Sequence, residues 1–171
     1  LVHNQLLVPL LLPQIGHVAL IADDDPLTAS GVELEPRDWQ ALHAFYRANI
    51  ARHGGIPYLT ERFFDLARTT LAHRLVATLA YRGEEAVAGT INFEKGPHLY
   101  GRYWGCLDDF QMLHFELCYY RLIERAIERR CARFEAGAQG EHKLKRGLAP
   151  AFTHSAHWIR HAGLSEAIAA F

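Results

Sequence analysis

Apolar positions recur at helical spacing in the stretch that begins at Pro36. Proline suits the first turn of a helix, where its missing N–H costs little, and His53-Gly54-Gly55 ends the pattern. Thr60 can cap a second helix by accepting a backbone N–H. The apolar positions of the two expected helices are Trp39, Leu42, Phe45, Tyr46 and Ile50 in the first, and Phe63, Phe64, Leu66 and Leu71 in the second.

Three short stretches farther along the chain have the composition of strands. They cover Leu75–Tyr81, Ala86–Phe93 and Leu99–Trp104, and the turns Arg82–Glu85 and Lys95–Pro97 join them. Because parallel strands need long crossover connections, these short turns predict an antiparallel meander.

A longer helix is expected over Leu113–Arg130, and a short strand over Ala132–Ala136. A glycine-bearing loop follows at 137–140, and Ala151–Ile159 is expected to form the final strand. This order of elements predicts an α/β fold with a mixed, mainly antiparallel sheet flanked by helices. The apolar face expected for the long helix consists of Leu113, Leu117, Tyr120, Ile123 and Ile127.

The first 34 residues contain an apolar run, Leu6–Leu12, that Pro9 interrupts. The run is too short to span a bilayer, which needs roughly 20 apolar residues, and it lacks the basic flank and cleavage site of a signal peptide. A buried strand or a packed terminal segment is expected here, followed by an acidic loop at Asp23-Asp24-Asp25-Pro26.

The composition is that of a soluble domain: 171 residues, 50% hydrophobic and 22% charged. The formal net charge of −1 gives no global attraction to nucleic acid or anionic membranes, although a local basic patch stays open. Cys106, Cys118 and Cys131 lack paired spacing, so we expect reduced thiols in a cytoplasmic protein, with Cys118 packed as a small apolar residue. The only methionine, Met112, is internal, which suggests a removed start or a piece of a longer chain.

The densest polar stretch is the segment 135–147. Its glycines let a backbone approach a ligand closely, and successive N–H groups can form an anion-binding nest. Its lysines and arginine supply charge for a phosphate or an oxyanion. Glu135 lies in a short apolar strand, where an acid is rarely buried unless it is paired. The alternative is a solvated basic loop.

Two further groups of residues are candidates for substrate binding or catalysis. Strand alternation puts Tyr100, Arg102 and Trp104 on one sheet face, where they could form a substrate floor or simply pack, with an amphipathic arginine between aromatic rings. Glu116 near a helix N-terminus either complements the helix dipole or acts as a general base or ammonium-binding carboxylate.

The sequence contains no common motif for a metal site or for a catalytic serine. His154 and His157 would point to opposite faces of the expected final strand, and neither HExxH nor CxxC occurs, so no metal site is expected. Gly-x-Ser-x-Gly is also absent, which leaves a serine triad without support.

Several motifs in a fixed order resemble the FemAB-like family of the GNAT acyltransferase superfamily, over about residues 35–171. They are Tyr58-Leu59-Thr60, the segment 99–106, the segment 114–120 and the segment 135–147. The resemblance implies an acyl-CoA N-acyltransferase fold and a link to peptidoglycan biosynthesis or recognition. Fem transferases move an aminoacyl group from aminoacyl-tRNA to an amine of a cell-wall precursor, and simpler relatives use acyl-CoA.

The same resemblance implies a domain organisation and a key lysine. Relatives usually carry tandem acyltransferase-like domains, so residues 35–171 are expected to form a GNAT-like second domain, and residues 1–34 to be a remnant of a missing N-terminal domain. Fem transferases carry a lysine near the final strand, and Lys143 or Lys145 takes that position here.

Together these features give the hypothesis of an N-acyltransferase. Lys143, Lys145 or Arg146 would stabilise an oxyanion or phosphates, and Glu116, Glu135 or His142 would handle the proton. The substrate would be a small-molecule or peptide amine, with acyl-CoA or aminoacyl-tRNA as co-substrate, no permanently bound cofactor and no membrane span. The alternatives are a non-catalytic module that binds peptide or cell-wall precursor, and a domain that is inactive without its partner domain. The substrate-binding candidates are Tyr100, Arg102, Trp104, Gln139, Gly140 and Arg146.

Overall fold

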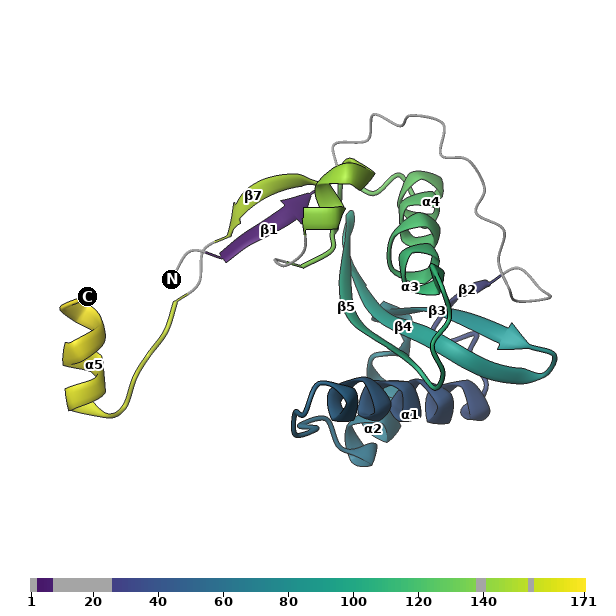
Figure 1. The fold of residues 1–171 in the computed structure, drawn as a ribbon, viewed down its shortest axis with the longest axis horizontal. Helices are drawn as coiled ribbons and strands as arrows, with labels where there is room; N and C mark the ends of the chain where they lie inside the picture. Colours follow the sequence, from purple (N-terminus) through teal and green to yellow (C-terminus); the bar gives the residue numbers. More distant parts are fainter. Residues whose placement is uncertain (1–2, 8–25, 138–140, 154–155) are drawn as a thin grey trace.

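The protein is a layered α/β structure in which helices cover both faces of one sheet (Figure 1). The structure, a computed structural model, describes residues 3–7, 26–137, 141–153 and 156–171. Within these residues the sheet has seven strands in the order β2-β3-β4-β5-β6-β1-β7. Their bounds are β1 His3–Leu7, β2 Leu27–Ser30, β3 Leu75–Arg82, β4 Glu85–Lys95, β5 His98–Cys106, β6 Arg133–Glu135 and β7 Ala149–Thr153.

The pairing confirms the predicted fold class. Strands β3, β4 and β5 form the expected antiparallel meander; β4 and β5 extend beyond both predicted ends, and β3 beyond its predicted C-terminal end. Only β5 and β6 pair in parallel among the described strands. The helical segment 113–128 provides the crossover between them that parallel pairing requires.

A β-bulge in β5 contradicts the predicted face of the aromatic residues. Ile91 of β4 pairs with Tyr103, but the next residue, Asn92, pairs with Gly101, so Arg102 is an extra residue on β5. The extra residue reverses the alternation from that point onward. Trp104 therefore packs toward the 113–128 helices, whereas Tyr103 packs toward the opposite face.

Helices α1 (Pro36–Arg52) and α2 (Glu61–Thr70) cover one face of the sheet, seen below the strands in Figure 1. The Asp38 carboxylate accepts the Glu35 N–H at 2.8 Å and so stabilises the start of α1. Thr60 takes the predicted capping position of α2, but its side chain makes no capping hydrogen bond.

The predicted apolar face of the second helix is only partly correct. Phe64 is buried against α1, but the side chain of Leu66 is 51% exposed. Leu71 lies beyond the helix, which ends at Thr70, and is 38% exposed as the chain enters the 3₁₀-helix η1 (Ala72–Arg74).

On the opposite face, the predicted continuous helix is interrupted. It consists of α3 (Leu113–Phe115), the π-helix η2 (Glu116–Tyr120) and α4 (Arg121–Glu128). In a π-helix the backbone hydrogen bonds join residues five apart, one more than in an α-helix. As a result Leu122, and not Tyr120, lies in the core after Leu117, and Tyr119 is buried in place of Tyr120. The face shifts accordingly: Ala126 is buried, and Ile127, expected inside, is 38% exposed.

The last part of the chain differs most from the prediction. Residues 141–146 form the 3₁₀-helix η3 (Glu141–Arg146), β7 ends at Thr153, and residues 156–159 form no strand. Helix α5 (Ala162–Ala169), which the pattern did not predict, lies apart from the layers at the far end of the β1–β7 pair (Figure 1). All of its residues are exposed. A helix without a buried face needs no apolar stripe, and such a stripe is the pattern from which the other helices were predicted.

Some predictions lie outside the described residues. These are the apolar run beyond Leu7, the acidic residues 23–25, the loop 138–140 and His154. No helix in the described part of the chain is both long and apolar enough to cross a membrane.

The core divides between the two sheet faces. Leu42, Phe45 and Tyr46 of α1 pack on one face, and Leu117 and Leu122 pack on the other. At Gly105 of β5, an added Cβ would collide with the Phe45 carbonyl of α1, so only glycine allows this close approach of helix and strand.

Candidate active site

A pocket of about 630 Å³ opens where β4, β5, the π-helix and η3 meet. It combines cationic, imidazole, hydroxyl, thiol and amide groups from widely separated parts of the sequence. The lining residues are His53, Asn92, Gly101, Arg102, Tyr103, Trp104, His114, Cys118, Tyr119, Ala136, His142 and Lys143.

Lys143 is the buried cation of this pocket. It is 5% exposed, and its Nζ donates to the backbone carbonyls of Ala136 at 2.6 Å and Gly137 at 3.1 Å. These carbonyls lie just beyond the end of β6, so the strand end positions the ammonium. Burial lowers the pKa of Lys143, and only the nearby Cys118 thiol acts in the opposite direction. A lowered pKa makes the ammonium a better hydrogen-bond and proton donor.

Two imidazoles lie beside the lysine. Tyr119 Oη and His142 Nε2 are 3.0 Å apart, and the His114 ring centroid lies 5.6 Å from that of Tyr119 and 5.2 Å from that of Trp104. Burial, helped by the charges of His142 and Lys143, lowers the pKa of His114 to about 4. Burial also lowers the pKa of His142 and raises that of Tyr119 to about 12. Near neutral pH both imidazoles are therefore uncharged and the phenol is protonated.

The three cysteines are free thiols. Cys118 forms part of the pocket wall and packs against the core of the α4 face, in agreement with its predicted packing role. Burial raises its pKa strongly, so it is a neutral thiol.

Four predicted site residues line the pocket: Arg102, Trp104, His142 and Lys143. Arg102 was expected between the rings of Tyr100 and Trp104, but its guanidinium lies 4.9 Å from the Tyr103 ring centroid. Lys145 is exposed and is not among the described lining residues.

Arg146 supports the pocket from behind. Its guanidinium lies 3.7 Å from the Phe115 ring centroid, and its Nη1 donates to the His142 carbonyl at 2.8 Å. These contacts fix the backbone of the residue that carries the imidazole. Arg146 is therefore placed as a supporting residue and not among the described lining residues.

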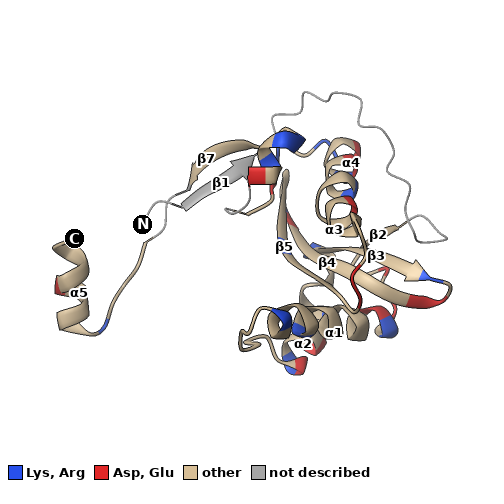
Figure 2. Cartoon of the chain, viewed as in Figure 1, with Lys and Arg blue, Asp and Glu red and all other residues tan. Residues whose placement is uncertain are grey.

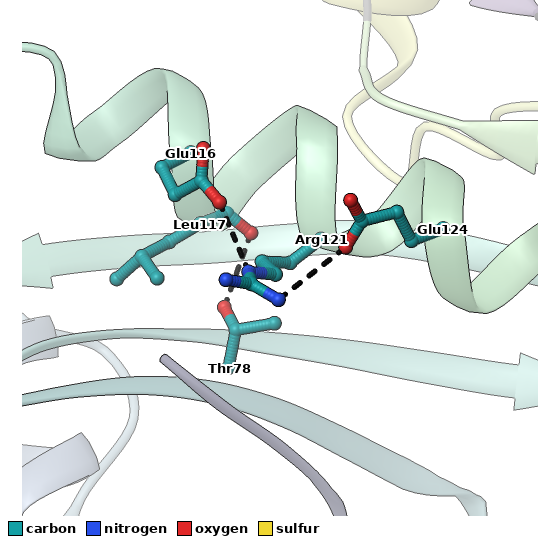
Figure 3. A network of polar contacts seen from close by, with 5 residues as sticks. All are labelled: Thr78, Glu116, Leu117, Arg121 and Glu124. Atoms are coloured by element: carbon teal, nitrogen blue, oxygen red, sulfur yellow. Dashed lines mark hydrogen bonds and ion pairs between the residues drawn. The ribbon is translucent and has the colours of Figure 1, made fainter. Parts of the chain in front are cut away.

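The two predicted carboxylates lie away from the described pocket lining. Glu116 is 9% exposed, and its Oε1 lies 2.9 Å from Arg121 Nε (Figure 3). Glu135 forms a 3.8 Å ion pair with Arg133, which fits the expectation that an acid in an apolar strand is paired.

Tyr100 is likewise outside the described lining and pairs with His98, with Tyr100 Oη 3.2 Å from His98 Nδ1. Gln139 and Gly140 lie outside the described residues.

The π-helix is connected to the sheet by a buried hydroxyl. Thr78 Oγ1 of β3 donates to the Leu117 carbonyl at 3.1 Å, and Figure 3 shows this contact next to the Glu116–Arg121–Glu124 ion pairs. The Thr78 hydroxyl also bonds to that of Thr90 on β4. The bond from Thr78 to the Leu117 carbonyl fixes the π-helix against the sheet and thereby places Cys118 and Tyr119 in the pocket wall.

Sequence reasoning missed several lining residues, among them His53, Asn92, His114 and Tyr119. For Asn92 a signal existed, because an amide within an apolar strand must find buried partners. His114 and Tyr119 lie in the motif 114–120, but neither received a role, because the π-helix changes which side of the helix faces the pocket.

The described lining carries cations and no carboxylate. In Figure 2 the short helix η3, between the labels of β7 and α4, carries Lys and Arg in blue next to one acidic residue, Glu141, in red. A local basic region therefore exists despite the near-neutral chain, and it suits phosphate-bearing or carboxylate-bearing ligands. No group of three or more His, Cys, Asp or Glu side chains within the described segments is arranged to hold a metal ion.

The mixed sheet with helices on both faces is consistent with a GNAT-like fold. The family model for peptidoglycan biosynthesis/recognition matches residues 26–171, so the chain belongs to the FemAB-like family. This confirms the resemblance drawn from the motifs, and the match begins before residue 35. The comparison with curated proteins found no match. The domain boundary between residues 34 and 35 stays a prediction.

Proposed function

We propose that this chain is an N-acyltransferase that moves an acyl or aminoacyl group from an activated donor to an amine of a peptidoglycan precursor. The observation that carries this proposal is Lys143, a buried ammonium that projects into a pocket beside uncharged imidazoles. The family's description supports the choice of a cell-wall acceptor.

Lys143 acts on the acyl oxygen. Hydrogen bonds to Ala136 and Gly137 occupy two of its three N–H donors. The third donates to the acyl carbonyl oxygen, which becomes an oxyanion in the tetrahedral intermediate. A preorganised donor at such an oxygen contributes roughly 10²–10³-fold in rate.

His142 accepts the proton of the attacking amine. Its uncharged imidazole is held by the Tyr119 hydroxyl through Nε2 and by Arg146 through the backbone. Tyr119 can donate to Nε2 or accept from it, and the second arrangement leaves Nδ1 as the proton acceptor. We assign Glu116 and Glu135 structural ion pairs in place of this role.

The transfer proceeds by addition of the amine and then loss of the leaving group. The amine lone pair forms a C–N bond to the acyl carbon, the carbonyl electrons move to oxygen, and the amine proton passes to His142. The oxyanion then collapses, and the C–S bond of a thioester or the C–O bond of an aminoacyl ester breaks. The leaving thiolate or alkoxide takes up the proton from His142, which returns to its uncharged form. Arg102 supplies charge for phosphates of either donor.

Mass spectrometry of reaction mixtures tests this proposal. The purified chain is incubated with a muropeptide that has a free side-chain amine, together with acyl-CoA or aminoacyl-tRNA. The expected result is a muropeptide whose mass is increased by one acyl or aminoacyl group with one of the donors. Lys143→Met, which keeps the side-chain length but removes the charge, should reduce the rate roughly 100-fold.

Lys95→Met is the matched control and should retain the wild-type rate, because Lys95 is the exposed last residue of β4. Equal rates for Lys143→Met and wild type would contradict the proposal. Muropeptide binding without transfer from either donor would also contradict it and would favour the non-catalytic binding module.

A further inference from the structure

Asn92 is a buried amide on the wall of the pocket. It lies in β4 between the apolar residues Ile91 and Phe93, and only 1% of it is exposed. Burying a carboxamide is costly unless its polar atoms have partners. The surface that Asn92 does contribute belongs to the pocket.

The hydrogen bonds of Asn92 determine which of its side-chain atoms can bind a ligand. Nδ2 donates to the Val76 carbonyl at 3.0 Å and to Thr90 Oγ1 at 2.7 Å. Because a carbonyl can only accept, the amide cannot be turned over without losing the first bond. Oδ1 has no hydrogen-bond partner among the described residues. It is thus an acceptor held in one orientation.

Gly101 leaves room next to this oxygen. On the neighbouring strand β5, a Cβ added at Gly101 would lie 3.7 Å from Asn92 Oδ1, 3.4 Å from the Glu135 carbonyl and 3.7 Å from Ala136 Cα. A methyl group would fit there without a clash and would partly cover the oxygen.

Asn92 and Lys143 are connected across three strands. Asn92 of β4 pairs with Gly101 of β5, which lies against Ala136 at the end of β6. The Ala136 carbonyl in turn holds Lys143 Nζ. An oriented acceptor on β4 and a cationic donor on η3 therefore face one pocket.

We propose that Asn92 Oδ1 binds the acceptor substrate by accepting an N–H of its reacting amine, which holds the nitrogen for attack on the acyl group bound by Lys143. This inference rests on the proposed function. The acceptor it defines is an uncharged primary amine, because the described lining offers a neutral oxygen and no carboxylate to an ammonium. The N–H bond aligns the nitrogen lone pair, and the proton itself still goes to His142.

Gly101→Ala tests the inference without touching the Asn92 amide. We expect the KM for the muropeptide to rise about fivefold to tenfold, as for one lost hydrogen bond, while the KM for the donor stays within twofold of wild type. Asn92→Leu should raise the muropeptide KM at least as much. Its thermal midpoint is measured alongside, because it also leaves the Val76 carbonyl without its donor.

Gly163→Ala, in the exposed helix α5, is the matched control and should leave both KM values unchanged. An unchanged muropeptide KM in Gly101→Ala overturns the inference but leaves the proposed function intact. A parallel change in both KM values also overturns it.

A binding measurement separates this inference from the proposed function. Native mass spectrometry compares the muropeptide with the same muropeptide trimethylated at its amine, in the absence of donor. Wild type should prefer the free amine by about fivefold, and Gly101→Ala should lose that preference. Equal affinity of wild type for the two muropeptides overturns the inference whether or not transfer is observed.

Discussion

The two faces of the sheet are built differently. The face covered by α1 and α2 is regular, with a continuous 17-residue helix whose apolar side chains form one core cluster. The face covered by residues 113–128 contains a π-helix, abuts the β5 bulge and buries Thr78, Thr90, Asn92, Glu116 and Lys143.

The comparison shows that the pocket lies where regular structure is interrupted. π-Helical turns and β-bulges are frequent at functional sites because they redirect side chains that a regular element would point elsewhere. The buried polar groups on this face cost stability unless they are paired. We therefore expect substitutions in the α1 core, away from the pocket lining, to change stability alone, and substitutions on the π-helix face to change activity.

The largest stability effect should come from the regular face. Leu42→Ala removes a side chain that is 1% exposed and should lower the free energy of unfolding by about 2–5 kcal/mol, measured by urea denaturation. Leu66→Ala, at a half-exposed position on α2, is the control and should cost less than about 1 kcal/mol. If the folded fraction of Leu42→Ala lost transfer activity, the two faces would not be separable.

A smaller stability effect is expected at the connection between the sheet and the π-helix. Thr78→Val keeps the shape of the side chain but leaves the Leu117 carbonyl without its donor, and should cost about 1–3 kcal/mol in urea denaturation. It should also raise the muropeptide KM, because the π-helix carries pocket residues. Thr70→Val, at the exposed end of α2, is the control. Unchanged stability in Thr78→Val would show that the hydroxyl does not fix the π-helix.

The smallest effect is a pH dependence on the pocket side. The pKa of His114 falls from its ordinary 6.5 to about 4 on folding, so the unfolded chain takes up the proton first as the pH falls. His114 therefore makes stability decrease between about pH 6.5 and pH 4, by roughly 1–2 kcal/mol for this partly exposed ring. Urea denaturation across this range should show a shallower pH dependence in His114→Gln than in wild type. Identical slopes would contradict the burial of an uncharged imidazole.

Sequence patterns predicted the regular face and much of the sheet, because α1 and the meander follow ordinary helical and strand periodicity. They placed Tyr100 on the same sheet face as Trp104 and Ile127 in the core, and both assignments are wrong, since one bulge and one π-helical turn each shift the periodicity by one residue. Such insertions depend on tertiary hydrogen bonds, such as that of Thr78 to Leu117, which no local pattern reveals.

The candidate site was predicted only in part, because burial and pairing of its residues also depend on the tertiary fold. The polar segment 135–147 was identified, but a choice between Lys143 and Lys145 requires knowing that a 3₁₀-helix buries the first and exposes the second. Glu116 and Glu135 have suitable chemistry, but their arginine partners come from the fold around them. The pocket residues Asn92 and His114 come from different elements and meet only in three dimensions.

The most direct test of the account is the muropeptide transfer rate per folded molecule in Lys143→Met and in Leu42→Ala. We predict a loss of roughly 100-fold in Lys143→Met with its fold retained, and a rate within twofold of wild type in Leu42→Ala after correction for its lower stability. Equal rates in the two variants would contradict the assignment of the chemistry to the π-helix face.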